Sequence, residues 1–452
     1  MHLSLVMRST RDILQRATAL LLFVFFFSGL GSGYSVLTHE EIVDLLWKDQ
    51  IQPLLLKRFP GATDEDLRKA HAYAYGGCML QDMGYYPFGN KYFSDLVHYV
   101  RSGDFVEALL NDSSDLNEYA FALGALSHYA SDNSGHPTIN RAVAMEFPKL
   151  RKKHGDAVTY ADDPKAHIRT EFGFDMVQVA KNRFTSDRYH DFIGFEVSKP
   201  LLERAFFETY GLKLEDVFGD VDLAIGTYRR AVSKIVPEMT RVALLSRRDT
   251  IVKDTPNFNR KEFLYYLSRK NYQKEWGTVY RRPGLGTRIL AFFLKLVPKV
   301  GPFKAVNFKI PDQRTEDMYI KSVDQTVEEY ARLLGEVRSG KLELPNRDFD
   351  TGRDTRAGEY ALTDKTYAQL VDDLSNKSPD PLPPGLRQNV LQFYSDMNAP
   401  IATKKNAKAW QKLQDELDKL KDRAQGSMRT SARWLFAGSP MRKSVRRLAL
   451  IL

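Results

Sequence analysis

Three side chains that can bind a metal recur at every fourth position of one segment: His128, Asp132 and His136, within FALGALSHYASDNSGHPTIN (121–140). Residues four apart lie one turn above one another on an α-helix, so a helix here would present all three on one face. Small residues such as Gly124 surround them and would let neighbouring helices approach closely. The segment therefore predicts the central helix of a metal site, although by itself it fits a helix with two hydrogen-bonded histidines and a capping aspartate equally well.

The composition is that of a globular protein with a substantial core, since 43% of the 452 residues are hydrophobic. The formal net charge of +9 favours anionic partners such as phospholipid headgroups or nucleic acid, but charge alone does not distinguish between them. Cys78 is the only cysteine, so no disulfide within the chain can stabilise the fold. Bound metals or the size of the core must do so instead.

The N-terminus has the pattern of a secretory signal peptide. Three arginines precede an apolar run at residues 17–27, and small residues up to Gly33 follow it. The run is shorter than the roughly 20 residues that a membrane-spanning helix needs. We therefore expect residues 1–33 to be cleaved as a signal peptide, and the protein to be secreted or to reside in the cell envelope.

A second group of candidate ligands lies at the start of the expected mature chain. Its first residue would be Tyr34, whose free amine and carbonyl form a chelate, and His39 follows five residues later. Thr38 and Glu41 have the spacing of a capping box, which predicts a helix with His39 in its first turn. The processed N-terminus and His39 could therefore bind one metal together.

Four more candidates flank the central segment. Asp82 lies among apolar and aromatic residues, where a buried carboxylate needs a hydrogen-bond or metal partner. His98 lies beside the apolar face of a predicted helix, where a core histidine is more common than a ligand. His167 and Glu171 are four residues apart on a helix that we expect to begin near Pro164, so both would lie on one face of it.

These candidates form an unusually large set of imidazoles and carboxylates, without cysteine. Such ligands suit Zn²⁺ in a hydrolytic site with open positions for water or substrate. The set has more members than one metal needs, so it predicts a metal cluster. His71, near Asp82, is expected to be a structural or a surface histidine instead. The candidate side chains are His39, Asp82, His98, His128, Asp132, His136, His167 and Glu171.

The order and spacing of these ligands resemble the zinc-dependent phospholipase C family, which is related to the single-strand-specific zinc nucleases and to the N-terminal domain of glycosylphosphatidylinositol-specific phospholipase D. The resemblance spans residues 34 to about 246. It implies an all-α, multi-helix bundle that binds three zinc ions. The implied ligands are Asp82, His98 and His128 for one zinc, the Tyr34 amine and carbonyl with His39 for a second, Asp132 as a bridge between these two, and His136, His167 and Glu171 for the third.

Two features depart from the family pattern. The secreted phospholipases and nucleases begin with Trp, whereas this chain would begin with Tyr34; since the ligating atoms belong to the main chain, the change is tolerable. The spacing from Asp132 to His136 is shorter than in the compact bacterial phospholipases and closer to that of the phospholipase D relatives.

The metal chemistry of such a site implies phosphodiester hydrolysis. A water between two zincs loses its proton near neutral pH and attacks phosphorus, while the third zinc stabilises charge on the phosphoryl and leaving-group oxygens. Asp82 is the candidate catalytic residue, because a carboxylate facing the water can orient it or accept its proton.

Three functions are compatible with this sequence. The first is a phospholipase C that cleaves phospholipid at a membrane surface to diacylglycerol and a phosphorylated headgroup. The second is a nuclease acting on single-stranded nucleic acid, whose bases could stack on Tyr85, Tyr86 or Phe88. The third is a non-catalytic, metal-stabilised domain of the envelope.

The expected organisation is a catalytic domain over residues 34–345, followed by a helical C-terminal extension over residues 346–452. Within the catalytic domain, residues 249–310 interleave aromatic and basic side chains. This segment either lies on an anionic membrane or packs one face of a solvated helix on the core.

Overall fold

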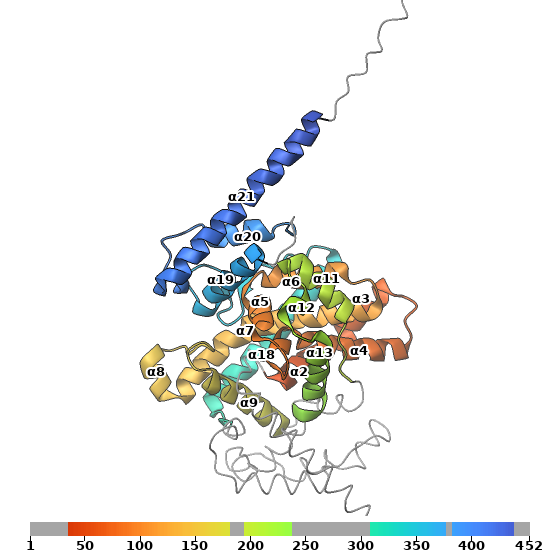
Figure 1. The fold of residues 1–452 in the computed structure, drawn as a ribbon. Coiled ribbons are helices and arrows are strands. Elements are labelled where there is room, and N and C mark those ends of the chain that lie inside the picture. Colours follow the sequence, from red (N-terminus) through yellow and green to blue (C-terminus); the bar gives the residue numbers. More distant parts are fainter. Residues whose placement is uncertain (1–34, 181–193, 237–307, 377–381, 438–452) are drawn as a thin grey trace, which may run out of the picture.

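The part of the chain that the structure describes is mainly helical and has almost no strand, which confirms the predicted all-α fold (Figure 1). The expected signal peptide and nearly all of the basic aromatic segment lie outside the described residues. The computed structural model describes residues 35–180, 194–236, 308–376 and 382–437.

The first part of the chain forms a series of helices joined by short turns. In chain order they are α2 (Val36–Leu46), the π-helix η1 (Trp47–Ile51), α3 (Gln52–Arg58), α4 (Asp64–Cys78), the 3₁₀-helix η2 (Gln81–Tyr85), α5 (Lys91–Tyr99), α6 (Ser102–Asp112), α7 (Leu116–Glu146), α8 (Pro148–His154) and α9 (Pro164–Ala180).

The second part adds further helices and one very short antiparallel strand pair, in which Arg347 pairs with Asp354 and Asp348 with Arg353. In chain order the elements are α11 (Lys199–Tyr210), α12 (Leu214–Val217), α13 (Val221–Arg230), the π-helix η3 (Ala231–Ile235), α18 (Gln313–Ser339), β1 (Arg347–Asp348), β2 (Arg353–Asp354), α19 (Ala361–Asn376), α20 (Leu386–Phe393), the 3₁₀-helix η5 (Ala402–Lys405) and α21 (Ala407–Ala437).

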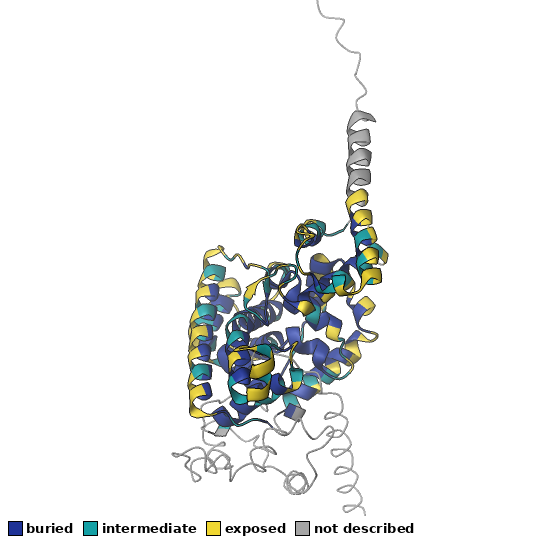
Figure 2. Cartoon of the chain, turned by 90° about the vertical axis from the view of Figure 1, so that its left-hand side faces the viewer, coloured by how far each residue is buried: buried dark blue, intermediate teal, exposed yellow. Residues whose placement is uncertain are grey.

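Helix α7 is the centre of the fold, with α4 and α18 packed along it and α2, α6 and α9 also in contact (Figure 1). It begins where Asp115 accepts a hydrogen bond from the Glu118 amide at 2.8 Å, an N-cap that satisfies one of the free amides of the first turn. Every residue from 118 to 132 is buried, as expected of a helix that is largely apolar on all sides. Figure 2 shows that other helices have buried residues on the sides that face one another and exposed residues on their outer sides.

The small residues of α7 allow the close packing that the sequence predicts. A Cβ atom added to Gly124 would lie 2.1 Å from the Ala74 carbonyl oxygen and 2.9 Å from the Cys78 amide nitrogen. The backbones of α4 and α7 therefore touch at this glycine, and any side chain here would push them apart.

The start of α2 differs from the prediction. Ser35 is its N-cap residue, and no capping bond forms through a side chain, so the expected capping box at Thr38 and Glu41 is wrong. The Thr38 hydroxyl instead donates to the Asp175 carboxylate on α9. His39 still lies near the beginning of the helix. No helix in the described part of the chain is both long enough and apolar enough to cross a membrane.

Candidate metal centre

The eight predicted ligand side chains converge from five elements, and none is more than 4% exposed. His39 lies on α2, Asp82 on η2 and His98 on α5, whereas α7 and α9 carry the rest. Tyr34 lies outside the described residues. The potential ligand atoms gather in three groups, within 4.8 Å of one another in each: His39, His128 and Asp132; Asp82, His98 and His128; and His136, His167 and Glu171.

Asp132 lies at the middle of these groups. Its Oδ1 is 3.4 Å from His39 Nε2, and its Oδ2 is 3.1 Å from His128 Nε2. The same Oδ2 lies 3.3 Å from His136 Nε2 and 3.4 Å from His98 Nε2. One carboxylate therefore faces four imidazoles, and its two oxygens face different histidines, as expected of a carboxylate that bridges two metals.

The donor separations match those of atoms that share one zinc. Two donors bound to a tetrahedral zinc at about 2.0–2.1 Å lie about 3.3–3.4 Å apart. His98 Nε2 lies 3.5 Å from Asp82 Oδ1, 3.5 Å from His128 Nε2 and 3.4 Å from Asp132 Oδ2. Most of these separations exceed a normal hydrogen bond but fit ligands around a common ion.

Backbone carbonyls orient two of the imidazoles toward the centre. His98 Nδ1 lies 2.8 Å from the Ser94 carbonyl oxygen, and His128 Nδ1 lies 2.8 Å from that of Cys78. A carbonyl can only accept, so each Nδ1 carries the hydrogen and each Nε2 presents a lone pair to the other ligands. This outer hydrogen bond is typical of metal-bound histidine.

Asn140 orients His167 in the third group. Its Nδ2 donates to the Asp350 carbonyl oxygen at 2.8 Å, so its Oδ1 faces His167 Nε2, also at 2.8 Å, and accepts that hydrogen. His167 Nδ1 is then a lone-pair atom, and it lies against Glu171 Oε1. Two acceptors in such close contact need a proton or a cation between them.

Without a bound cation, burial and neighbouring charges shift the pKa values of the ligand side chains in different directions. Burial and the nearby His128 lower the pKa of His39 to about 3, and burial raises the pKa of Asp82. Burial opposes the charged form of His98 too, yet the nearby carboxylates of Asp132 and Asp82 raise its pKa to about 10. A bound cation resolves this conflict, because it keeps imidazoles neutral and carboxylates ionised.

Several buried polar atoms of the centre have no hydrogen bond within the described residues. They include Asp82 Oδ1 and both ring nitrogens of His136. Buried polar atoms are nearly always satisfied, so unsatisfied ones at a cluster of imidazoles and carboxylates mark positions for an ion. The donor set fits zinc.

Two carboxylates near the centre were not predicted. Asp175 accepts hydrogen bonds from the Leu37 amide at 3.0 Å and from the Thr38 hydroxyl, and thereby fixes the start of α2 next to His39. It continues the four-residue spacing of His167 and Glu171, and that pattern could have identified it. Asp350 Oδ1 lies 3.5 Å from His136 Nε2, and no local pattern in the sequence marks it.

Other residues singled out in the sequence lie outside the three groups. His71 Nε2 is 3.0 Å from Asp44 Oδ1 and its ring stacks on Trp47 at 3.8 Å, so of the two roles expected for it His71 has the structural one. Tyr86 is 3% exposed and packs edge-on against Tyr228. Tyr85 lies closer to the centre, with its ring 6.0 Å from that of His98.

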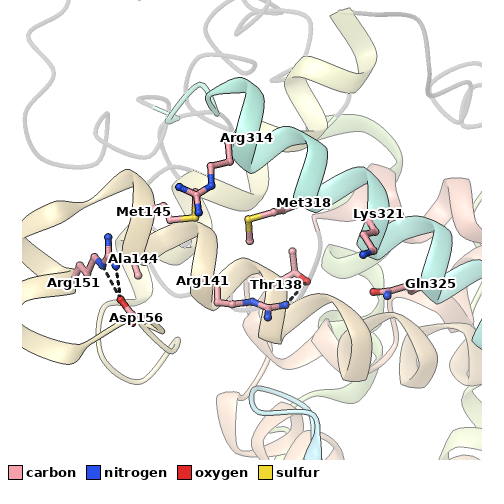
Figure 3. A pocket seen from close by; sticks show the side chains of 10 residues that line it. All are labelled: Thr138, Arg141, Ala144, Met145, Arg151, Asp156, Arg314, Met318, Lys321 and Gln325. Carbon is pink, nitrogen blue, oxygen red and sulfur yellow. Dashed lines mark hydrogen bonds and ion pairs between the residues drawn. The ribbon is translucent and has the colours of Figure 1, made fainter.

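A separate groove of about 620 Å³ lies between the C-terminal half of α7, α8 and α18 (Figure 3). Met145 and Met318 line it together with these charged residues: Arg141, Arg151, Asp156, Arg314 and Lys321. Arg151 pairs with Asp156 at 2.7 Å, whereas no ion pair is formed by the other three cations within the described residues. The groove therefore presents uncompensated positive charge.

A comparison with protein families matches residues 38–219 to the family described as zinc dependent phospholipase C. The matched stretch contains all eight predicted ligand side chains and ends before α18 and the β1–β2 pair. Searches of curated proteins and of solved structures gave no match to the chain.

Proposed function

We propose that this chain, whose residues 38–219 match the zinc-dependent phospholipase C family, is a phospholipase C that hydrolyses phospholipids at a centre of three zinc ions. The observation that carries the proposal is the convergence of eight buried side chains into three groups, each with three potential metal ligands. The three groups correspond to the three zinc ions that the ligand set implies.

The residues of each group would hold one ion. Asp82, His98 and His128 form the first site, and Asp132 joins it to the second, where His39 would be completed by the amine and carbonyl of Tyr34. The third site is formed by residues of α7 and α9: His136, His167 and Glu171. When bound, zinc lowers the pKa of water and draws electron density from phosphoryl oxygens.

Asp82 is the residue that we assign to the attacking water. Its carboxylate is 2% exposed, and its Oδ1 has no hydrogen bond in the described structure. A carboxylate oxygen without a protein donor can accept a hydrogen bond or a proton from a water that reaches it. It can therefore orient the water or accept its proton.

The groove of Figure 3 supports a phospholipid substrate. Arg141, Arg314 and Lys321 supply positive charge that lipid phosphates would neutralise, and Met145 and Met318 supply flexible apolar contacts. The nuclease alternative would need exposed aromatic faces. Tyr86 is buried against Tyr228 and offers none, whereas Phe88 is 59% exposed and remains a candidate for stacking on a base.

Export is part of the proposal. The second site would be complete only if cleavage after Gly33 exposes the Tyr34 amine, and Asp175 holds the adjoining residues 37 and 38 in place. Sequencing the N-terminus of the mature protein tests this directly. Any start other than Tyr34 would remove the amine from the site.

The test of function compares two histidine variants of the mature protein. His128→Ala removes a side chain shared by two ligand groups, so it should lose bound zinc and phosphodiester hydrolysis. His71→Ala is the matched control, because His71 is also buried but lies outside the groups. It should retain both zinc and turnover.

Substrate choice is measured on phosphatidylcholine vesicles and on single-stranded DNA. We expect release of the phosphorylated headgroup from the vesicles and little cleavage of DNA. Faster cleavage of DNA than of phospholipid would favour the nuclease over the phospholipase. Normal turnover by His128→Ala would refute a metal-dependent hydrolase at this centre.

A further inference from the structure

We propose that Asp350 is a fourth side-chain ligand of the third metal site, supplied by the turn between β1 and β2 from beyond the family-matched stretch. The inference rests on the proposed function, since it needs His136, His167 and Glu171 to bind an ion. It extends the ligand set into a part of the chain whose sequence gave no indication of a catalytic role.

The turn that carries Asp350 is docked on the helices that hold the other ligands. The Phe349 amide donates to the His98 carbonyl oxygen at 3.2 Å, and the Phe349 ring packs edge-on against the His98 imidazole at 5.3 Å. Upstream, the Ser102 hydroxyl donates to the Arg347 carbonyl oxygen at 2.6 Å. These contacts bring the turn to the centre from both sides.

Gly352 lets the other end of the turn approach α7. It has a φ of 67°, and a Cβ there would lie 2.6 Å from the Asn133 carbonyl oxygen. That carbonyl belongs to the residue after Asp132, and the backbone contact sets the position of the turn relative to the ligands on α7. Asp350 is therefore held against the centre by the main chain on both sides.

The two carboxylate oxygens of Asp350 have different surroundings. The side chain is 2% exposed. Its Oδ2 accepts hydrogen bonds from the hydroxyl of Tyr99, at 3.0 Å, and from that of Tyr360. Its Oδ1 faces His136 Nε2 at 3.5 Å. Outer donors that fix one oxygen and leave the other toward the site are typical of metal-bound carboxylates.

The separation from His136 distinguishes a shared ion from a direct hydrogen bond. A hydrogen bond between these atoms would be about 2.7–3.2 Å long, whereas two ligands on one tetrahedral zinc lie about 3.3–3.4 Å apart. The observed 3.5 Å fits the shared ion. It also equals the separation of His98 and Asp82 in the first site.

Asp350 is also connected to His167, the second histidine of this site. Its carbonyl oxygen accepts the hydrogen bond from Asn140 Nδ2, and Asn140 Oδ1 in turn accepts from His167 Nε2. The position of residue 350 therefore fixes which nitrogen of His167 carries a lone pair. The turn contributes to the site through its backbone as well as through its side chain.

The experiment measures zinc binding by Asp350→Asn, which keeps the shape of the side chain and removes its charge. Asp348→Asn is the matched control: Asp348 is 3% exposed and accepts hydrogen bonds from the Thr363 hydroxyl and the Thr351 amide. We expect the wild type and the control to bind three zinc ions per chain. Asp350→Asn should bind its weakest ion at least about 100-fold less tightly, because loss of an outer partner alone costs about 10–100-fold.

A second measurement separates a ligand from a structural residue. Thermal unfolding is followed with and without zinc, since a bound ion stabilises the folded state in proportion to its affinity. If Asp350 binds the ion, zinc should stabilise Asp350→Asn less than it stabilises wild type. The metal-free variant should then be as stable as metal-free wild type. If the metal-free variant is the less stable protein and its zinc affinity is normal, Asp350 is structural and the inference is wrong.

These outcomes are distinct from failure of the proposed function. Wild-type protein that binds no zinc would refute the metal centre as a whole. Wild type and Asp350→Asn that both bind three ions with equal affinity would overturn the role of Asp350 and leave the other ligands in place.

Discussion

Replacing Gly124 by alanine should destabilise the fold and weaken zinc binding together. The added Cβ would lie 2.1 Å from the Ala74 carbonyl oxygen, whereas real Cβ atoms essentially never approach within 3.0 Å. Helix α4 must therefore move by about 1 Å, and overpacking of this kind costs about 1–3 kcal/mol. The higher helix propensity of alanine offsets up to about 1 kcal/mol of that.

The same displacement reaches the metal centre through Cys78. The new Cβ would lie 2.9 Å from the Cys78 amide nitrogen, and the carbonyl of that residue orients His128 at 2.8 Å. Misorienting a metal-bound histidine typically costs about 10–100-fold in affinity, so Gly124→Ala should show such a loss.

The assay is urea unfolding of the zinc-free protein, followed by zinc titration. Gly226→Ala on α13 is the control, since a Cβ at Gly226 meets nothing within 4 Å. It should stabilise the protein by about 0.5–1 kcal/mol through helix propensity alone. If Gly124→Ala proves as stable as the control and binds zinc normally, α4 can yield without cost, and the argument from close packing fails.

Two further predictions concern charge. Burial raises the pKa of Asp175 to about 7, although hydrogen bonds from Thr38, Ser35 and Leu37 oppose this shift. The folded state therefore binds more protons than the unfolded state between about pH 4 and 7. The free energy of unfolding should fall as the pH rises through that window. Asp175→Asn should flatten this slope in urea unfolding measured from pH 4 to 8, and an unchanged slope would show that the carboxylate is ionised when buried. In the groove, Arg141→Glu with Arg314→Glu should weaken sedimentation with anionic phospholipid vesicles and leave hydrolysis of a soluble short-chain phosphodiester unchanged. Equal sedimentation of the variant and wild type would exclude the groove as a contact for lipid phosphates.

The sequence predicts those parts of the centre that depend on local spacing. Residues four apart on one helix must share a face, so the rows on α7 and α9 could be recognised without knowing the fold. The small residues of α7 likewise predicted close helix packing, and Gly124 provides it. His71 has no other potential metal ligand four residues away in the sequence. In the structure it contacts Asp44 and lies outside the three ligand groups.

What the sequence could not predict depends on contacts between distant segments. Thr38 had two possible partners, a local amide in a capping box and the Asp175 carboxylate, and only the packing of α9 against α2 decides for Asp175. Asp350 lies in an irregular turn with no periodic pattern around it. The predicted boundary at residue 345 would assign it to the extension, although its carboxylate lies 3.5 Å from His136.

The charge of the centre gives Asp350 a reason to be present. The three zinc ions of the proposed centre would carry six positive charges, and the buried imidazoles bound to them would stay neutral. Asp82, Asp132 and Glu171 would leave the centre with three positive charges, and Asp350 reduces this to two. A phosphodiester carries one negative charge and deprotonated water carries another, so the centre with Asp350 becomes neutral when both are present. Because its side chains are at most 4% exposed, each uncompensated charge there is costly, and the fourth carboxylate matches the centre to its proposed substrate.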